Sequence, residues 1–193
     1  IHQAPRVSLR AMHPTLNIAV RAARSAGRIV MRSYERTDRL TIETKSPNDF
    51  VSEVDREAEA AIVQELRSKF PDHAILGEEG GQQGGRSNEF EWIIDPLDGT
   101  TNYLHGFPQF SISIALKYRG QLEHGVVYDP LREELFTATR GGGAHLNDRR
   151  LRVTKRTGIG GALLGTGIPY RDLVHIDAYL GMLKALLADS AGV

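Results

Sequence analysis

The sequence contains no cysteine, and this absence excludes two kinds of site at once. Without thiols the chain can form neither a disulfide framework nor a zinc site held by thiolates. The sequence also lacks an apolar run of the roughly 20 residues that a membrane-spanning helix needs. It shows no secretory apolar segment either. We therefore expect a cytoplasmic protein that does not associate with a membrane.

An excess of charge of one sign is missing too. Lys and Arg together number 24 and Asp and Glu together number 24, so the formal net charge is +0. Proteins that bind nucleic acid through bulk electrostatics carry a marked positive excess. The charge balance argues against that class. The hydrophobic content of 40% is typical of a globular chain with a real core.

Several local signatures of common enzyme classes are also absent from the sequence. No Gly-x-Gly-x-x-Gly follows an apolar run, and there is neither a Walker A lysine loop nor a nucleophile elbow. The histidines never fall at the i, i+4 spacing of a helical zinc pair. Carboxylates are therefore the groups whose pattern says most about chemistry.

The most informative stretch is the octapeptide 95–102, Asp-Pro-Leu-Asp-Gly-Thr-Thr-Asn, which follows the short apolar run Trp92–Ile94. The run predicts a buried strand, because it is β-rich and ends at a turn. The two carboxylates behind it repel each other unless a cation lies between them. Gly99 has no Cβ and allows a ligand to approach the backbone. Thr100 and Thr101 would present hydroxyl and N–H groups to an anion at a helix start.

A simpler interpretation of this stretch has to be weighed. Asp-Pro and Asp-Gly dipeptides are ordinary turn formers, and a lone Asp-Gly between strands is more often a hairpin than a metal site. Two acids around Pro-Leu with Gly-Thr-Thr behind them are much rarer. Hard carboxylate oxygens suit Mg²⁺. We therefore predict a Mg²⁺ site with phosphate donors beside it.

Acids elsewhere in the chain are ambiguous on local evidence. Ser52 is expected to cap a helix, and Asp55 three residues later fits that capping arrangement, which explains it structurally. Glu78 and Glu79 follow the predicted strand 74–77, and adjacent acids at a strand end usually form a solvated loop. If that loop lies near the turn that carries Asp95 and Asp98 (the aspartate turn), one of the two glutamates would be a further metal ligand. Both interpretations stay open from the residues alone.

The remaining periodicity predicts the elements around this stretch. Apolar residues at helical spacing predict an amphipathic helix of about five turns that begins near Pro14. Its arginines form either a solvated face or a surface for a partner. The expected helix that opens at Ser52 ends at Pro71. The polar, glycine-rich segment 82–88 is predicted to be mobile.

Strict alternation begins at Phe110 and predicts an antiparallel meander. The expected β segments, including a short one before the second helix and one after the meander, are 40–44, 110–118, 122–128, 134–139, 144–146, 151–153 and 162–165. A helix is predicted over 172–187. The predicted fold is a layered α/β sandwich of the α+β kind, with two N-terminal helices packed on a largely antiparallel sheet.

The predicted organisation has three parts. Residues 1–11 lack periodicity and are interpreted as a tail upstream of the folded chain. Residues 12–155 are expected to form an N-terminal metal-binding lobe. Residues 156–193 are expected to begin a second, C-terminal α/β lobe.

The segment Trp92–Asn102 resembles the first signature of the inositol monophosphatase family. Three further segments are similar to that family in order and spacing, namely Lys45–Asp55, Gly77–Glu79 and Gly125–Tyr128. The resemblance runs from about Met12 to the end of the sequence and is strongest to bacterial inositol-1-monophosphatases. It implies the inositol monophosphatase/sugar phosphatase fold.

The resemblance also implies a set of metal ligands. Glu78, Asp95 and the main-chain carbonyl of Leu97 would hold a first Mg²⁺. Asp95 and Asp98 would hold a second Mg²⁺, and Glu78 would share in a weaker third site and in catalysis.

Further roles follow from the same resemblance. Asp55 would orient the Thr100 hydroxyl, which helps to activate a water. The N–H groups of Gly99 and Thr100 would bind the phosphate, with Asp98 also at the substrate. Lys45 would lie near the site and interact with it through a water.

The implied activity is hydrolysis of inositol 1-phosphate by direct, in-line attack of a metal-activated water, without a covalent phosphoenzyme. Relatives also cleave fructose 1,6-bisphosphate or nucleotide 3′-phosphates, so a related sugar or nucleotide phosphatase is an alternative. Bacterial relatives are linked to transcription and ribosome biogenesis, so a docking protein of the transcription machinery is another. The family is lithium-sensitive and commonly forms homodimers, which we carry over as an expectation.

The sequence departs from the family at one place. The family has a second signature near its C-terminus, of the pattern Trp-Asp-x-Ala-Ala-Gly, whose aspartate completes the second metal site. The sequence ends at Val193 before such a motif. We therefore expect an incomplete C-terminal lobe.

Overall fold

The computed structural model describes residues 13–34, 42–46, 49–169 and 173–193. It divides into two compact units, one of Ile1–Glu43 with Val51–Leu151 and one of Thr44–Phe50 with Arg152–Val193. The predicted division near residue 155 stays a prediction.

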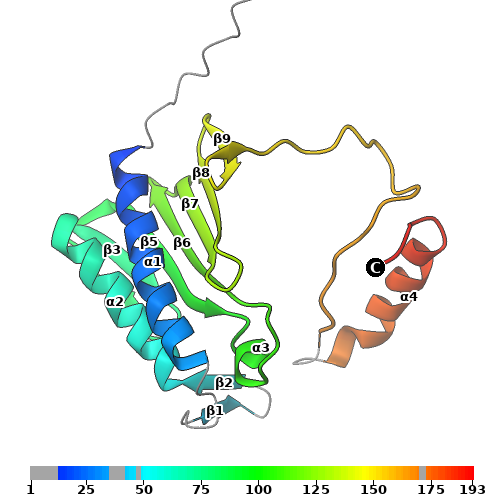
Figure 1. The fold of residues 1–193 in the computed structure, drawn as a ribbon, viewed down its shortest axis with the longest axis horizontal. Coiled ribbons are helices and arrows are strands. Elements are labelled where there is room, and N and C mark those ends of the chain that lie inside the picture. The colour runs from blue at the N-terminus through cyan, green and yellow to red at the C-terminus, as the bar shows by residue number, and fades with distance from the viewer. Residues whose placement is uncertain (1–12, 35–41, 47–48, 170–172) are drawn as a thin grey trace, which may run out of the picture. The chain divides into compact units, whose positions relative to one another are not determined.

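Two helices cover one face of a twisted sheet in the first unit (Figure 1). Helix α1 is Pro14–Tyr34 and α2 is Glu53–Lys69, which confirms both predicted helices. The buried stripe of α1 consists mainly of small side chains, which let the helix approach its neighbours closely. Its members are Leu16, Ala19, Ala22, Ala23, Ala26, Gly27 and Val30.

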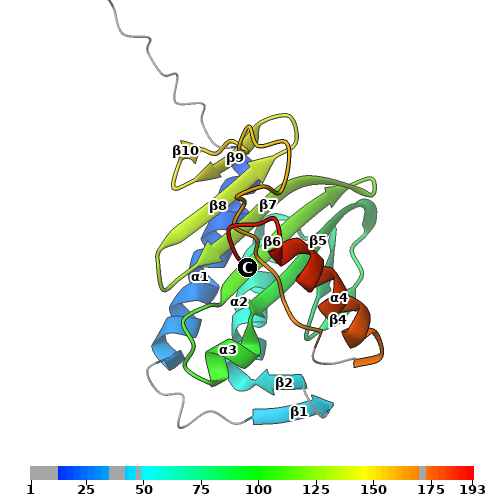
Figure 2. The ribbon, with the colours of Figure 1, turned by 90° about the vertical axis from the view of Figure 1, so that its right-hand side faces the viewer.

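The sheet has eight strands in the order β10-β9-β8-β7-β6-β5-β3-β4. Among the described strands of this sheet, only β3 and β5 pair in parallel, so the prediction of a largely antiparallel sheet is confirmed (Figure 2). Their bounds are β3 His73–Gly77, β4 Gly81–Gln83, β5 Ser87–Asp98, β6 Ser111–Tyr118, β7 Gln121–Asp129, β8 Glu134–Thr139, β9 Gly143–Leu146 and β10 Arg149–Arg150.

The core lies between the helices and this sheet. Alternate residues of β6 are buried, in agreement with the alternation of its sequence. Trp92 and Ile94 of β5 are buried beside them, as the apolar run predicts. The same core contains Val54, Ala58, Ile62 and Leu66 of α2 with Ile112, Ile114 and Leu116 of β6.

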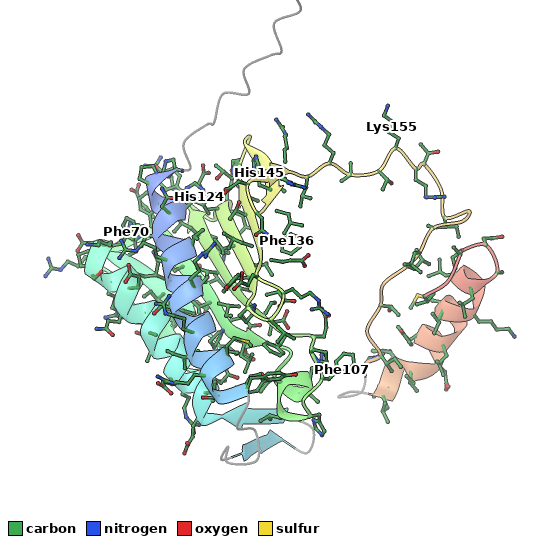
Figure 3. The ribbon with its side chains drawn as sticks, in the orientation of Figure 1. Phe70, Phe107, His124, Phe136, His145 and Lys155 are labelled. Atoms are coloured by element: carbon green, nitrogen blue, oxygen red, sulfur yellow. The ribbon has the colours of Figure 1, made fainter. Side chains whose placement is uncertain are left out.

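An aromatic cluster joins the end of α2 to the start of β3. Phe70 lies just beyond α2 (Figure 3) and stacks on the His73 ring at a centroid distance of 4.8 Å. Trp92 Nε1 donates a hydrogen bond of 3.1 Å to His73 Nδ1. Burial lowers the pKa of His73, which keeps Nδ1 an acceptor for that bond. The cluster fixes where β3 starts beside β5.

The segment 82–88, which was predicted to be mobile, overlaps β4, which pairs with β3, and the start of β5; its mobility stays a prediction. Two strand predictions are wrong. The strand expected at 151–153 is wrong, because the return strand is β10 at Arg149–Arg150. The strand expected at 162–165 is also wrong: among the described residues, only Leu163 there is bridged, to Gly192.

A separate two-stranded sheet and the second unit complete the chain. β1 Ile42–Ser46 pairs with β2 Asp49–Ser52, so the predicted strand at 40–44 is shifted towards the C-terminus, and residues 40 and 41 lie outside the description. In the second unit, a 3₁₀ turn at Leu173–His175 leads into α4, Ile176–Leu187, where a helix was predicted. None of the described helices is both long and apolar enough to span a membrane. The side chain of Ser52 lies outside the description, so its predicted capping role stays a prediction.

Candidate metal and phosphate site

The parallel pairing of β3 with β5 brings two acidic strand ends to one edge of the sheet. Carboxyl ends of parallel strands meet at the same edge. Gly77 pairs with Ile94, and the Glu78 N–H donates a hydrogen bond of 3.1 Å to the Ile94 carbonyl. Glu78 therefore lies just beyond the end of β3, beside the point on β5 where Asp95 follows the buried residue Ile94.

An irregularity in β5 then separates its two aspartates. Asp95 pairs with Ser113 of β6 and Asp98 pairs with Ser111, so β5 carries an extra residue between these pairs. Such a bulge changes the direction of the neighbouring side chains. The Leu97 N–H donates a hydrogen bond of 3.2 Å to Asp95 Oδ1, which holds that carboxylate against its own turn.

Gly99 makes the turn into the next helix. Its φ is 90°, in the left-handed region that favours glycine. A Cβ at this position would also lie 2.8 Å from the Gln109 carbonyl oxygen. Helix α3, Thr100–Leu104, begins directly afterwards, as predicted. It has only five residues, so its individual N–H groups, rather than a long helix dipole, would serve an anion.

Asp55 and Thr100 come together from positions 45 residues apart. Thr100 Oγ1 lies 3.2 Å from Asp55 Oδ2 and 2.8 Å from the Leu97 carbonyl oxygen. Its single proton can serve only one of these acceptors at a time. Asp55 lies in the first turn of α2 and is only 2% exposed. The Asp55 carboxylate faces the aspartate turn, and a role in helix capping alone does not account for that position.

Electrostatics around Asp55 disfavour its charged form. Burial is the largest cause, followed by the charges of Glu79 and Glu78, and together they raise the pKa of Asp55 to about 8. The hydrogen bond from Thr100 acts in the opposite direction, and Asp95 adds a smaller repulsion. A buried carboxylate among other carboxylates is stabilised by a nearby cation.

The charged form of Asp95 is disfavoured in the same way. Burial and then the charges of Glu78 and Asp98 raise the pKa of Asp95 to about 7. An interaction with the Glu78 side chain raises the pKa of Asp95 further. The Glu78 and Asp95 side chains therefore lie close to each other.

The carboxylates Asp55, Glu78, Asp95 and Asp98 form a carboxylate cluster, and its donor chemistry fits Mg²⁺. Carboxylate oxygens and one main-chain carbonyl are hard ligands of the kind that Mg²⁺ prefers. Glu78 and Asp98 are exposed, so their carboxylates can adjust. Within the described ranges, no three acidic or histidine side chains are already gathered as a ligand set. Binding would therefore have to draw these carboxylates together.

Other residues expected at the site are placed less fully. The Lys45 backbone belongs to the part of β1 that is assigned to the second unit, and its side chain lies outside the description. Its expected role stays a prediction. The acids of the cluster itself all come from the first unit.

The sequence interpretation missed Glu59. Its side chain is 5% exposed and accepts hydrogen bonds from the backbone of the turn that carries Glu78. A signal was present, because Glu59 stands four residues after Asp55, next to Ala58 on the apolar stripe of α2. An acid on a buried stripe needs a partner.

The fold and this carboxylate cluster define a class of protein. A family model described as the inositol monophosphatase family matches residues 11–190. The chain belongs to the inositol monophosphatase family, and its layered fold is that of the family.

Particular relatives are similar to the chain over most of its length. Nus factor SuhB from Pseudomonas aeruginosa is 55% identical over 186 residues, which are 94% of this chain and 69% of the relative. The crystal structure of the extragenic suppressor protein suhB from Bartonella henselae has a TM-score of 0.90 at 42% identity, over 93% of this chain and 69% of that one. Inositol monophosphatase from Anabaena (Nostoc) sp. PCC 7120 has a TM-score of 0.77 at 35% identity, over 92% of this chain and 64% of that one.

Proposed function

We propose that the chain carries the metal-binding site of a Mg²⁺-dependent phosphomonoesterase that hydrolyses inositol 1-phosphate to inositol and phosphate. The observation that supports this most is that Asp55, Glu78 and Asp95, from three separate segments of the chain, lie near enough to one another to help raise the pKa values of Asp55 and Asp95. Repulsion of this kind is unfavourable unless the cluster binds a cation. Family membership supports the same chemistry.

Each residue of the cluster has a defined part in this proposal. Glu78, Asp95 and the Leu97 carbonyl would hold one Mg²⁺, and Asp95 with Asp98 would hold a second. When bound, the ions would neutralise the phosphate charge, lower the pKa of water and stabilise the leaving oxygen.

The chain's own groups would then orient the reactants. The N–H groups of Gly99 and Thr100 would donate to phosphate oxygens, and Asp98 would also contact the substrate. The Thr100 hydroxyl would hold the attacking water, and Asp55 would accept a proton through that hydroxyl. Attack on phosphorus would be direct, with no covalent intermediate. The expected homodimer and the Lys45 contact are parts of the same proposal.

The test is Mg²⁺-dependent release of phosphate by the wild type and by Asp95→Asn. Loss of a ligand shared by two ions is expected to lower kcat/KM about 100-fold or more, since such ions supply several kcal/mol. Asp148→Asn is the matched control, because Asp148 is exposed in the turn before β10 and already has a positive φ that Asn tolerates. Near wild-type turnover in Asp95→Asn would refute the proposal. Relative rates on inositol 1-phosphate, fructose 1,6-bisphosphate and a nucleotide 3′-phosphate distinguish the substrate alternatives.

A second candidate function is docking to a protein of the transcription machinery. Relatives at 55% and 46% identity are named Nus factors. An arginine surface on α1 offers a place for an acidic partner: Arg21, Arg24 and Arg28 line a pocket of about 230 Å³ with Ser25 and Glu65.

Neighbouring groups hold part of the arginine surface in place. Arg21 pairs with Glu65 at 2.8 Å, and the Arg24 guanidinium lies 5.8 Å from the centroid of the Tyr128 ring. Pull-down of Nus factors by Asp95→Asn separates the two functions: retained binding without activity supports docking as an independent role. Loss of that binding in Arg24→Glu would place it on the arginine surface.

A further inference from the structure

Glu59 is a buried acid with no part in the proposed hydrolysis. It stands one helical turn after Asp55, so the two side chains lie on the same side of α2. Its exposure is 5%, and a carboxylate at that depth is costly unless its oxygens accept hydrogen bonds.

Both oxygens of Glu59 accept from the same turn. The Glu79 N–H donates to Oε2 at 2.8 Å, and the Gly80 N–H donates to Oε1 at 2.7 Å. These are charge-assisted bonds, which are stronger than bonds between neutral groups. The approach is close: a Cβ on Gly77 would lie 2.5 Å from Oε2.

The turn held by Glu59 is under electrostatic stress. It carries Glu78 and Glu79, and both acids repel Asp55 while Glu78 also repels Asp95. This repulsion favours movement of the turn away from the cluster. The two bonds to Glu59 oppose that movement.

We propose that Glu59 is a positioning residue that clamps the turn 78–80 to α2 and so holds Glu78 beside Asp95 for cation binding. The inference rests on the proposed function. Helix α2 would then support the site twice, through Asp55 on the aspartate turn and through Glu59 on the turn 78–80. A side chain that orients a metal ligand typically changes metal affinity about 10–100-fold when it is altered.

The test compares Glu59→Gln with the wild type. Gln keeps the size of the side chain but replaces one acceptor by an amide NH₂ that faces an N–H donor. Amide hydrogen exchange of Glu79 and Gly80 in metal-free protein is expected to accelerate about 10-fold or more. The Mg²⁺ dissociation constant, measured by titration calorimetry, is expected to rise about 10-fold, with a smaller change in kcat at saturating Mg²⁺.

Two further variants make the result decisive. Glu57→Gln removes the same charge from an exposed position of α2, where the side chain pairs with Arg32 at 2.8 Å, and should change neither measurement. Glu59→Asp keeps the charge on a shorter side chain and should give intermediate values, which also covers a failure of Glu59→Gln to fold.

Unchanged exchange at Glu79 and Gly80, or an unchanged Mg²⁺ dissociation constant, in both Glu59 variants would overturn the inference. If the wild type binds no Mg²⁺, the proposed function fails and the positioning role fails with it. The exchange data would still report whether Glu59 holds the turn, so the two failures are distinguishable.

Discussion

The residues of the site differ in how well the local sequence around each one predicts its role. Asp95 and Asp98 share one turn with Gly99, and that local pattern alone predicts a cation site. Asp55 and Glu78 are ambiguous locally, because what distinguishes them is proximity to a turn tens of residues away. Glu59 was missed for the same reason: its partners are backbone N–H groups 20 and 21 residues further along.

Thr100 allows a test at the scale of one hydroxyl. Thr100→Val keeps the shape of the side chain but removes the hydrogen bond that lowers the pKa of Asp55. The loss of an oriented proton path is expected to lower kcat about 100-fold with little change in KM. Steady-state release of phosphate measures both constants.

Thr139→Val is the matched control, since the Thr139 hydroxyl contacts His124 on β7 and not the cluster. Its kcat should stay near that of the wild type. A Thr100→Val enzyme with a kcat equal to that of Thr139→Val would contradict the assigned role of the hydroxyl.

Elements with strong periodicity were predicted correctly, whereas a strand whose start is set by the preceding turn was misplaced. Alternation located β6, β7 and β8 because one face of each strand packs in the core. The strand after β9 was placed too late. Asn147 and Asp148 both have positive φ, so they form a two-residue turn, and pairing resumes at once with Arg149 opposite Leu146. The parallel β3–β5 pairing, which builds the site, has no local sequence signal.

The link from β4 to β5 gives a prediction at the scale of elements. A Cβ on Gly85 would lie 2.3 Å from the Asp72 carbonyl oxygen and 2.6 Å from the Ala74 nitrogen. Gly85→Ala should therefore force the backbones apart and destabilise the protein by about 1–3 kcal/mol. Thermal unfolding should show a midpoint lower by roughly 2–4 °C for each kcal/mol.

Gly84 offers a control one residue away. A Cβ there would meet nothing within 4 Å among the described residues, so Gly84→Ala should unfold near the wild-type midpoint. Equal midpoints for the two variants would show that the close approach at Gly85 does not constrain the strands.

At the scale of the whole molecule, the charge cluster is expected to link stability to pH and, through the proposed site, to Mg²⁺. Asp55 and Asp95 have pKa values of about 8 and about 7 in the folded protein, above their ordinary value of 3.8. The folded, metal-free protein therefore holds protons that the unfolded chain releases, and its stability falls as pH rises through this range.

The histidines act in the opposite direction at lower pH. Burial lowers the pKa values of His73 and His124, so their contribution to stability is lost as pH falls through 6.5 and is complete about one pH unit above it. Between pH 6.5 and pH 8 the histidines therefore add only a small gain in stability, and a net loss in this interval reports the carboxylates. A bound cation favours their charged forms and should remove the loss of stability.

The central claim is that these carboxylates form a cation site, and thermal unfolding with and without Mg²⁺ at pH 6.5 and pH 8 tests it most directly. For the wild type, we predict a midpoint that falls by about 3 °C from pH 6.5 to pH 8 without Mg²⁺. Mg²⁺ should raise the midpoint, more at pH 8 than at pH 6.5, and should do so far less in Asp95→Asn. A Mg²⁺ effect that is absent in the wild type, or equal in the wild type and Asp95→Asn, would contradict the claim.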